Sequence, residues 1–163
     1  MYQLVDFYSL FYLKFIKNHT LTERNSWLKK LNTPTFNSWS GYAFEQLGLY
    51  HLQQIKVALG ISGIETQTAS WKSTVSENGA QIDLVIDRKD GVINLCEMKF
   101  SVNPFVIDKK YDAELKNKLG TFITETKTRK AVFLSMITTY GLQQNLYSGN
   151  IQNELKMDVL FQN

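Results

Sequence analysis

The chain has 163 residues, of which 44% are hydrophobic and 13% aromatic, so it is long enough for one domain with a buried core and short for two. Lys and Arg exceed Asp and Glu by 18 to 15, and the net charge of +3 is compatible with nucleic-acid binding without establishing it. A single cysteine excludes an internal disulfide, and with only two scattered histidines it argues against a zinc site.

Several recognisable segments are missing from the sequence. It shows no signal peptide, no apolar run long enough to span a bilayer and no Gly-rich phosphate loop. We therefore expect a cytoplasmic protein that does not contact a membrane and does not bind ATP through such a loop.

The N-terminal region is dominated by aromatic residues. Residues 4–17 are predicted to form an aromatic helix that packs on the domain or against a partner, and residues 22–31 a second short helix. Pro34 lies in a predicted loop, 32–38. We place a boundary there, with residues 1–35 as a helical appendage and 36–163 as the main domain.

The next predicted helix runs over 41–59, with Ser40 as its cap and Gly60 at its end. Glu45 would lie in its first turn, where a carboxylate is stabilised by the helix dipole. His51 lies too far around this helix to share a site with Glu45 and is read as a structural histidine.

A hairpin is the clearest feature of the sequence. A strand is predicted over 61–73, a turn at 76–80, and then two strands, 83–88 and 92–99. The loop between the last two, Lys89-Asp90-Gly91, suits a type I turn followed by a left-handed Gly. Opposed residues then have numbers that sum to 180, and Cys96 falls on the apolar face as a buried thiol.

This register concentrates charge on the other face of the hairpin. Asp83 would lie opposite Glu97, and Gln81 opposite Lys99. Two carboxylates facing each other repel, and a divalent metal ion held by oxygen ligands would relieve that repulsion. The alternative is a solvated strand face with no site.

The C-terminal part completes an α/β pattern. A helix is predicted over 107–125 with Asp108 as its cap, then a strand at 131–138, a short helix at 142–147 and a closing strand at 156–161. The order favours a three-layer arrangement with a mixed sheet, antiparallel over 61–99 and extended through a helical crossover.

Seven basic residues lie on or just after the 107–125 helix. They would contact a phosphate backbone without reading sequence, or they form a solvated helix face. Tyr111, Leu115, Leu119, Phe122 and Ile123 are assigned to the inner face of the helix. The basic residues, with the first four on its outer face, are Lys109, Lys110, Lys116, Lys118, Lys127, Arg129 and Lys130.

Asp83 followed by Glu97-Met98-Lys99 resembles the signature of PD-(D/E)XK nucleases, although Ile82 stands where the signature has Pro. Over roughly residues 36–161 the chain is similar to the C-terminal domain fused to archaeal-type AAA ATPases. The stretches that carry this likeness are WSGYAFE at 39–45, the hairpin, IDKKY at 107–111, ITTYGL at 137–142 and DVLF at 158–161.

The resemblance implies a restriction-endonuclease-like core and metal-dependent hydrolysis of nucleic acid, with DNA expected as the substrate rather than RNA. Asp83, Glu97 and the backbone carbonyl of Met98 would hold Mg²⁺ or Mn²⁺, and Lys99 would orient the attacking water or stabilise the oxyanion. Glu45 would bind a second metal or assist a proton transfer, and Gln81 would position a phosphate oxygen. Tyr140 would stack or form a hydrogen bond near the site, unless it is a core residue.

Two alternatives remain open from the sequence. The nuclease fold would be kept without catalysis, as a module that binds DNA or docks to an AAA-type ATPase, or the chain is a structural domain with no site. The facing acids are the feature that a domain without a site explains least well.

Overall fold

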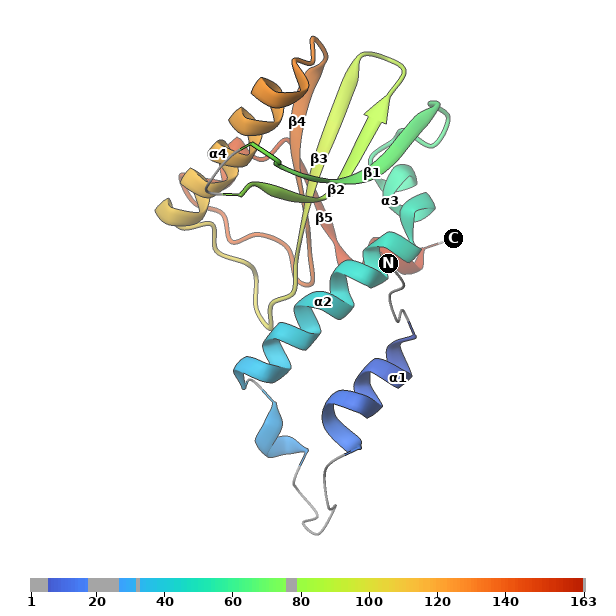
Figure 1. The fold of residues 1–163 in the computed structure, drawn as a ribbon, viewed down its shortest axis with the longest axis vertical. Coiled ribbons are helices and arrows are strands. Elements are labelled where there is room, and N and C mark those ends of the chain that lie inside the picture. The colour runs from blue at the N-terminus through green and yellow to red at the C-terminus, as the bar shows by residue number, and fades with distance from the viewer. Residues whose placement is uncertain (1–5, 18–26, 32, 76–78, 163) are drawn as a thin grey trace.

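The computed structural model describes residues 6–17, 27–31, 33–75 and 79–162. A five-stranded mixed sheet forms its centre, with α2 (Pro34–Tyr50) and α3 (Leu52–Ala58) on one face and α4 (Lys109–Thr126) on the other (Figure 1). The α/β class and the mixed sheet predicted from the sequence are confirmed. Among the described helices, none has the length and apolar character needed to cross a membrane.

The strands follow one another across the sheet in chain order. The first two pairs, β1–β2 and β2–β3, are antiparallel, and the pairs β3–β4 and β4–β5 are parallel. The change to parallel pairing occurs where α4 crosses over the sheet, as a parallel connection requires. The strands are β1 (Thr66–Lys72), β2 (Gln81–Arg88), β3 (Val92–Lys99), β4 (Ala131–Thr138) and β5 (Asn153–Lys156).

The predicted hairpin between β2 and β3 is present. Gly91 has φ of 90°, the left-handed conformation that the three-residue loop requires, and Arg88 pairs with Asp90 across the loop. The register runs from Leu84 opposite Cys96 to Asp87 opposite Ile93, in agreement with the predicted sum of 180.

Both faces of the hairpin are buried, although the predicted register gives only one mostly apolar face. The thiol of Cys96 is buried as predicted, and this burial raises its pKa to about 12. On the side of α2 and α3 the core contains Phe44, Ile55, Ile61, Leu84, Ile86, Cys96, Met98, Ile137, Leu155 and Leu160. On the side of α4 it contains Ile82, Val85, Ile93, Leu95, Ile107, Leu115, Phe122, Leu134, Met136 and Leu142.

The helix predicted over 41–59 begins earlier and is broken. The Thr33 hydroxyl accepts from the Phe36 amide and caps α2, while Pro34 takes the first helical position, so the predicted loop at 32–38 and the Ser40 cap are wrong. Glu45 consequently lies three turns after the start of α2, away from the N-terminal end of the helix dipole. The chain leaves helical geometry at His51, a half-buried residue that packs on the ring of Phe161.

Helix α4 agrees closely with the prediction. The Asp108 carboxylate accepts from the Tyr111 amide as the cap, and Lys127, in the left-handed conformation with φ of 52°, ends the helix. Ile123 was expected on the inner face, but it is 40% exposed.

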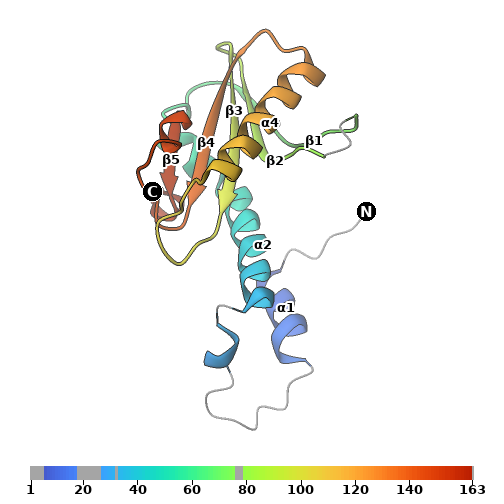
Figure 2. The same cartoon turned by 90° about the vertical axis from the view of Figure 1, so that its left-hand side faces the viewer.

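The N-terminal region packs against α2 through aromatic rings. The predicted helix over 4–17 is described as α1 (Phe7–Phe11) and the single π turn η1 (Tyr12–Ile16), and the one over 22–31 as η2 (Leu28–Lys30). Residues 4–5 and 22–26 of these predicted helices lie outside the described part. Figure 2 shows α1 and the start of α2 extending away from the sheet. The rings that meet there belong to Phe11, Phe15, Trp27, Phe36 and Trp39.

The C-terminal segment differs from the prediction. Residues 142–147 form no helix, and a 3₁₀ turn, η3 (Ser148–Asn150), follows them. The predicted strand at 156–161 is wrong, because β5 ends at Lys156 and η4 (Met157–Phe161) follows. Leu155 and Leu160 are buried at five-residue spacing, which a continuous strand could not place on one face.

Candidate active site

An irregularity in β2 shapes the site. Residues 69 to 71 of β1 pair with residues 85 to 82 of β2, so that Asp83 and Leu84 together oppose Ser70. This is a β-bulge with its extra residue in β2, and a bulge re-aims side chains beside it.

The bulge changes the predicted pairing of the acids. Regular pairing between β2 and β3 ends at Leu84 and Cys96, before it reaches Asp83 and Glu97. The expected ladder pairs of Asp83 with Glu97 and of Gln81 with Lys99 are therefore not formed, because the strands part at this end of the sheet.

Asp83 fills the gap between the parting strands. Its Oδ2 atom accepts a hydrogen bond of 2.8 Å from the Met98 amide of β3. Since the N–H groups of a strand point toward its neighbour in the plane of the sheet, the Asp83 carboxylate lies between β2 and β3. It also lines a cavity of about 350 Å³ whose other residues are Tyr42, Glu45, Gln46, Leu49, Ser70 and Gln81.

Glu97 is buried beneath α4, with 1% of its surface exposed. Cys96 and Met98 pack toward α2 and α3, so the alternation of a strand turns Glu97 to the opposite face. Its Oε2 atom accepts a hydrogen bond of 2.7 Å from Nζ of Lys118 on α4. Among the residues that the structure describes, its Oε1 atom has no hydrogen-bond partner.

Lys99 shares the α4 face with Glu97, as their two-residue spacing predicts. Its Nζ atom lies 4.0 Å from Oε2 of Glu97 and 5.6 Å from the centroid of the Tyr111 ring. Two ammonium groups, from Lys99 and Lys118, therefore flank one carboxylate oxygen.

The charges of the three acids influence one another. Burial raises the pKa of Glu97 to about 7, the nearby charge of Asp83 adds to the rise, and Lys118 opposes it. Burial also raises the pKa of Glu45, and Asp83 again adds to that rise while Lys99 and Lys118 oppose it. Asp83 thus lies within electrostatic reach of an acid on α2 and of an acid beneath α4.

The available ligands are oxygens, which suit Mg²⁺ or Mn²⁺. Within the described part of the chain, no three His, Cys, Asp or Glu side chains form a ready-made metal cage. Two carboxylates and a main-chain carbonyl remain as donors, and the buried, unpartnered Oε1 of Glu97 is the observation that fits a cation.

The two predicted supporting residues, Gln81 and Tyr140, lie in different surroundings. Gln81 lines the cavity that contains Glu45 and Asp83. Tyr140 is 56% exposed beyond the end of β4, so its reading as a core residue is wrong.

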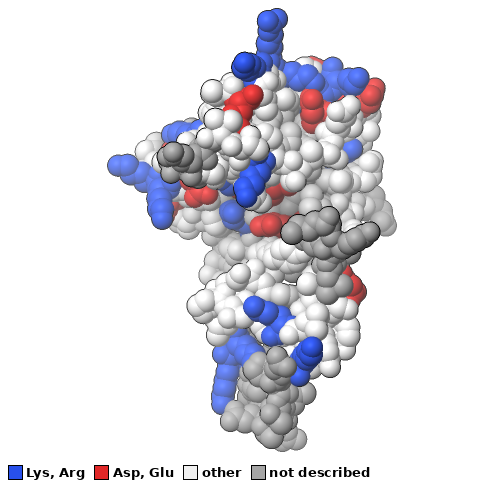
Figure 3. All heavy atoms as spheres, viewed as in Figure 1, with Lys and Arg blue, Asp and Glu red and all other residues white. Residues whose placement is uncertain are grey.

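The predicted basic surface falls into two parts. Lys109 and Lys110 begin α4, two turns before Lys118, whereas Lys127, Arg129 and Lys130 follow its other end, ~27 Å away for an 18-residue helix. Figure 3 shows basic side chains gathered over both ends of α4. The ammonium of Lys130 is engaged by the Asp87 carboxylate and the Arg88 carbonyl.

Lys118 is the functional candidate that the sequence analysis misplaced. It was assigned to the outer face of its helix, but its side chain is only 13% exposed and points to Glu97. The spacing of Tyr111, Leu115, Lys118 and Phe122 is the heptad-like spacing of one helix face. That spacing could have placed Lys118 on the inner face.

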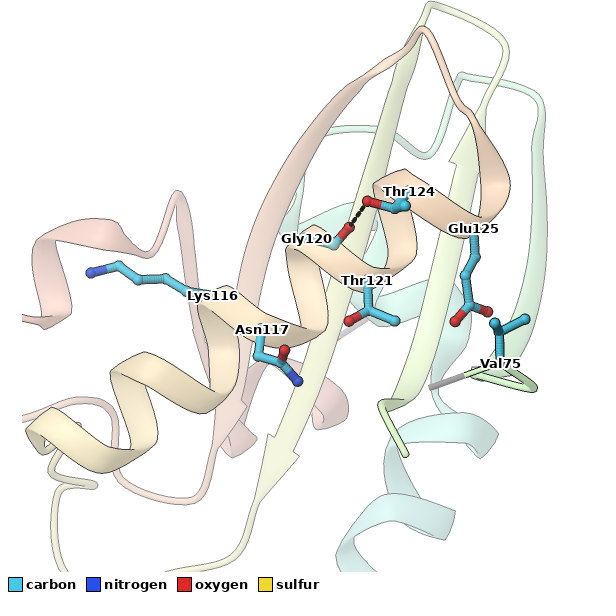
Figure 4. Close-up of a pocket in the computed structure, with 7 residues that line it drawn as sticks. All are labelled: Val75, Lys116, Asn117, Gly120, Thr121, Thr124 and Glu125. Atoms are coloured by element: carbon cyan, nitrogen blue, oxygen red, sulfur yellow. Dashed lines mark hydrogen bonds between the residues drawn. The ribbon is translucent and has the colours of Figure 1, made fainter. Parts of the chain in front are cut away.

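A second cavity, of about 470 Å³, lies beside α4 away from these acids. Figure 4 shows its lining side chains, with the Thr124 hydroxyl donating to the Gly120 carbonyl of the same helix. None of the candidate catalytic residues lines it. The residues drawn are Val75, Lys116, Asn117, Gly120, Thr121, Thr124 and Glu125.

No family model and no curated protein matches the sequence. Among solved structures, the protein of unknown function AF1548 is similar, with 18% sequence identity and a TM-score of 0.46. The match covers 69% of this chain and 64% of that chain, so this chain spans just under two thirds of its length. A likeness this weak assigns neither a fold family nor an activity.

Proposed function

We propose that this chain is a Mg²⁺- or Mn²⁺-dependent nuclease of PD-(D/E)XK type, with a restriction-endonuclease-like core. The observation that carries the proposal is Glu97, a buried acid with one oxygen that has no hydrogen-bond partner among the described residues, flanked by Lys99 and influenced by the charge of Asp83. An acid, a second acid and a lysine gathered where two strands part are the residues that such chemistry needs.

The metal would be held by Asp83, Glu97 and the main-chain carbonyl of Met98. Bound Mg²⁺ or Mn²⁺ supplies Lewis-acid stabilisation of the charge that develops on the phosphodiester. Asp83 already accepts a hydrogen bond from the Met98 amide, which fixes one of its oxygens and leaves the other for a ligand.

Lys99 and Glu45 have the chemical properties for two further roles. The Lys99 side chain is 31% exposed and its ammonium lies next to Glu97, so it can reach the attacking water or the developing oxyanion. Glu45 has a raised pKa and shares a cavity with Asp83, which suits it to proton transfer or to a second metal. Gln81, in the same cavity, would position a phosphate oxygen.

The substrate we propose is nucleic acid, with DNA as the first choice. Lys109 and Lys110 are exposed at the end of α4 that carries Tyr111 and lies beside Lys99. Contacts from these two lysines to the phosphate backbone would hold a strand without reading its sequence. Lys127 and Arg129, at the far end of α4, would contact a more distant part of the same strand.

A second candidate is a catalytically inactive module that docks to an ATPase of the AAA type. The observation that favours it is the exposed apolar surface of the N-terminal region, where Tyr8, Leu13 and Leu28 are 69%, 49% and 61% exposed. Large exposed apolar side chains that recur in one region of a protein are typical of an interaction surface.

An assay of plasmid and branched DNA cleavage in the presence of Mn²⁺ distinguishes the nuclease from the inactive docking module. Wild-type protein should cut, and D83A and K99A should each lower the rate by at least a hundredfold. A matched control is K109A, which should weaken substrate binding and leave the maximal rate nearly unchanged. A wild-type protein that neither cuts DNA nor binds Mn²⁺ favours the docking module, and undiminished cutting by D83A contradicts the proposed active site.

A further inference from the structure

Glu97 is oriented by a lysine that the nuclease signature does not contain. We propose that Lys118 of α4 is a positioning residue of this site, which holds Oε2 of Glu97 so that Oε1 is left as the oxygen for the metal. This inference rests on the proposed function.

The contact between the two residues is close and shielded from water. Nζ of Lys118 lies 2.7 Å from Oε2 of Glu97, and the two side chains are 13% and 2% exposed. Lys118 also lies 3.7 Å from the carboxylate of Glu114, a 50% exposed side chain one turn earlier on the same helix. A charge-assisted bond to a buried carboxylate stops the carboxylate from rotating, which is how groups behind a metal ligand orient it.

The second oxygen of Glu97, Oε1, is the candidate ligand atom. Oε1 is buried and makes no hydrogen bond in the described part of the chain, although the Tyr111 hydroxyl, which is also buried without a partner there, lies close enough that the pKa of Tyr111 is raised by burial and by Glu97. Burying an oxygen without a hydrogen-bond partner destabilises the folded protein, and a cation from solution would provide the missing interaction. With Oε2 already held by Lys118, Oε1 is the atom available to that cation.

The two lysines beside Glu97 are suited to different tasks. Lys99 lies 4.0 Å from Oε2, is 31% exposed and rests over the ring of Tyr111, so it is free to turn toward a substrate. Lys118 is more buried and closer, so its position is fixed by the packing of α4. We assign substrate contact to Lys99 and orientation of the metal ligand to Lys118.

Calorimetric titration of the full chain with Mn²⁺ at one pH tests this division. K118M should bind Mn²⁺ at least tenfold more weakly than wild type, and K118R should recover binding to within about threefold because its charge and donor remain. The matched control is K116M. Lys116 lies on the same helix and pairs with the buried Asp112 at 2.6 Å, but away from Glu97, so this variant should bind within twofold of wild type.

Urea unfolding of each variant without metal separates orientation from folding. If K118M fails to fold, K118Q takes its place in the titration, because glutamine keeps a hydrogen-bond donor without the charge. K118Q should also bind Mn²⁺ tenfold more weakly than wild type. Wild-type binding with K118M within twofold of it, or tighter, overturns the inference alone. Equal weakening in K118M and K118R also overturns it. A wild-type protein that binds no Mn²⁺ overturns the proposed function and this inference together.

Discussion

At the scale of single residues, Glu97 links stability to pH. Its pKa in the folded protein is about 7, above its ordinary value of 4.5, because it is buried near Asp83. The folded protein therefore favours the protonated acid. The contribution of protonated Glu97 to the stability of the fold is complete below pH ~4.5 and is lost as the pH rises through about 7.

The variant E97Q should remove this dependence. Between pH 5 and pH 8 and without metal, the free energy of unfolding of wild type should fall by on the order of 1–3 kcal/mol relative to that of E97Q. Each unit of difference between the folded and unfolded pKa corresponds to about 1.4 kcal/mol. Urea unfolding at several pH values in the presence of EDTA measures the difference. A difference between the two proteins that stays constant over this range contradicts the raised pKa.

Asp83 has a structural task as well as the proposed catalytic one. In D83A the Met98 amide loses its acceptor inside the sheet, which should lower the free energy of unfolding by about 1–3 kcal/mol. D83N keeps an acceptor oxygen and should unfold within about 0.5 kcal/mol of wild type, while both variants lose metal-dependent cleavage. Urea unfolding without metal compares them, and equal stabilities would show that the bond to Met98 contributes nothing.

At the scale of elements, the approach of α2 to β3 depends on a glycine. A Cβ atom at Gly48 would lie 2.4 Å from the Met98 sulfur, whereas one at Gly41 in the same helix would have no atom within 4 Å. Helix α2 can therefore pack closely on the sheet at Gly48, and this contact holds Glu45 one turn earlier above the site.

The pair G41A and G48A should separate helix propensity from packing. Alanine favours a helix over glycine by about 1 kcal/mol, so G41A should gain up to that amount. G48A should gain the same propensity but must displace the Met98 side chain, and we expect a net loss of about 1 kcal/mol. Urea denaturation of both proteins gives the comparison; a G48A protein as stable as G41A would contradict the tight contact.

At the scale of the whole molecule, the aromatic cluster of the N-terminal region is distinct from the two cores of the sheet. Phe15 is 5% exposed and contacts rings of Trp27 and Trp39, yet neither sheet core includes α1 or η1. The cluster thus ties the N-terminal region to the start of α2 and leaves the sheet to its own packing.

The variant F15A should loosen this region selectively. Loss of a buried phenyl ring costs about 3–5 kcal/mol locally. Amide hydrogen exchange should quicken in α1 and the first turns of α2, while β3 and β4 keep their protection. Faster exchange across the whole sheet would show instead that the N-terminal region and the sheet unfold as one unit.

Much of the sheet could be predicted because its signals are local. Strand β4 has the predicted bounds, and the loop ending in Gly91 set the register of the hairpin, because a three-residue turn leaves few ways to pair the strands. The start of α2 differs from the prediction because proline suits the first position of a helix as well as a loop, and Pro34 occupies that helical position.

The candidate site was harder to predict because it depends on contacts between distant segments. The bulge opposite Ser70 and the inward turn of Lys118 both arise from packing across the sheet, and no neighbour in the sequence reports them. The pairing of Asp83 with Glu97 failed for that reason, although both residues lie where the strands part.

The sequence by itself determined the α/β class, the hairpin with its register, the cap and extent of α4, and the short spacing that puts Glu97 and Lys99 on one strand face. Turn geometry, capping and alternation act over a few residues, so the sequence can express them directly. Only the tertiary structure decided that β2 bulges, that Asp83 bonds to the Met98 amide, and that Lys118 holds one oxygen of Glu97. Those outcomes depend on burial and on charges brought together from separate elements, which take effect only when the chain has folded.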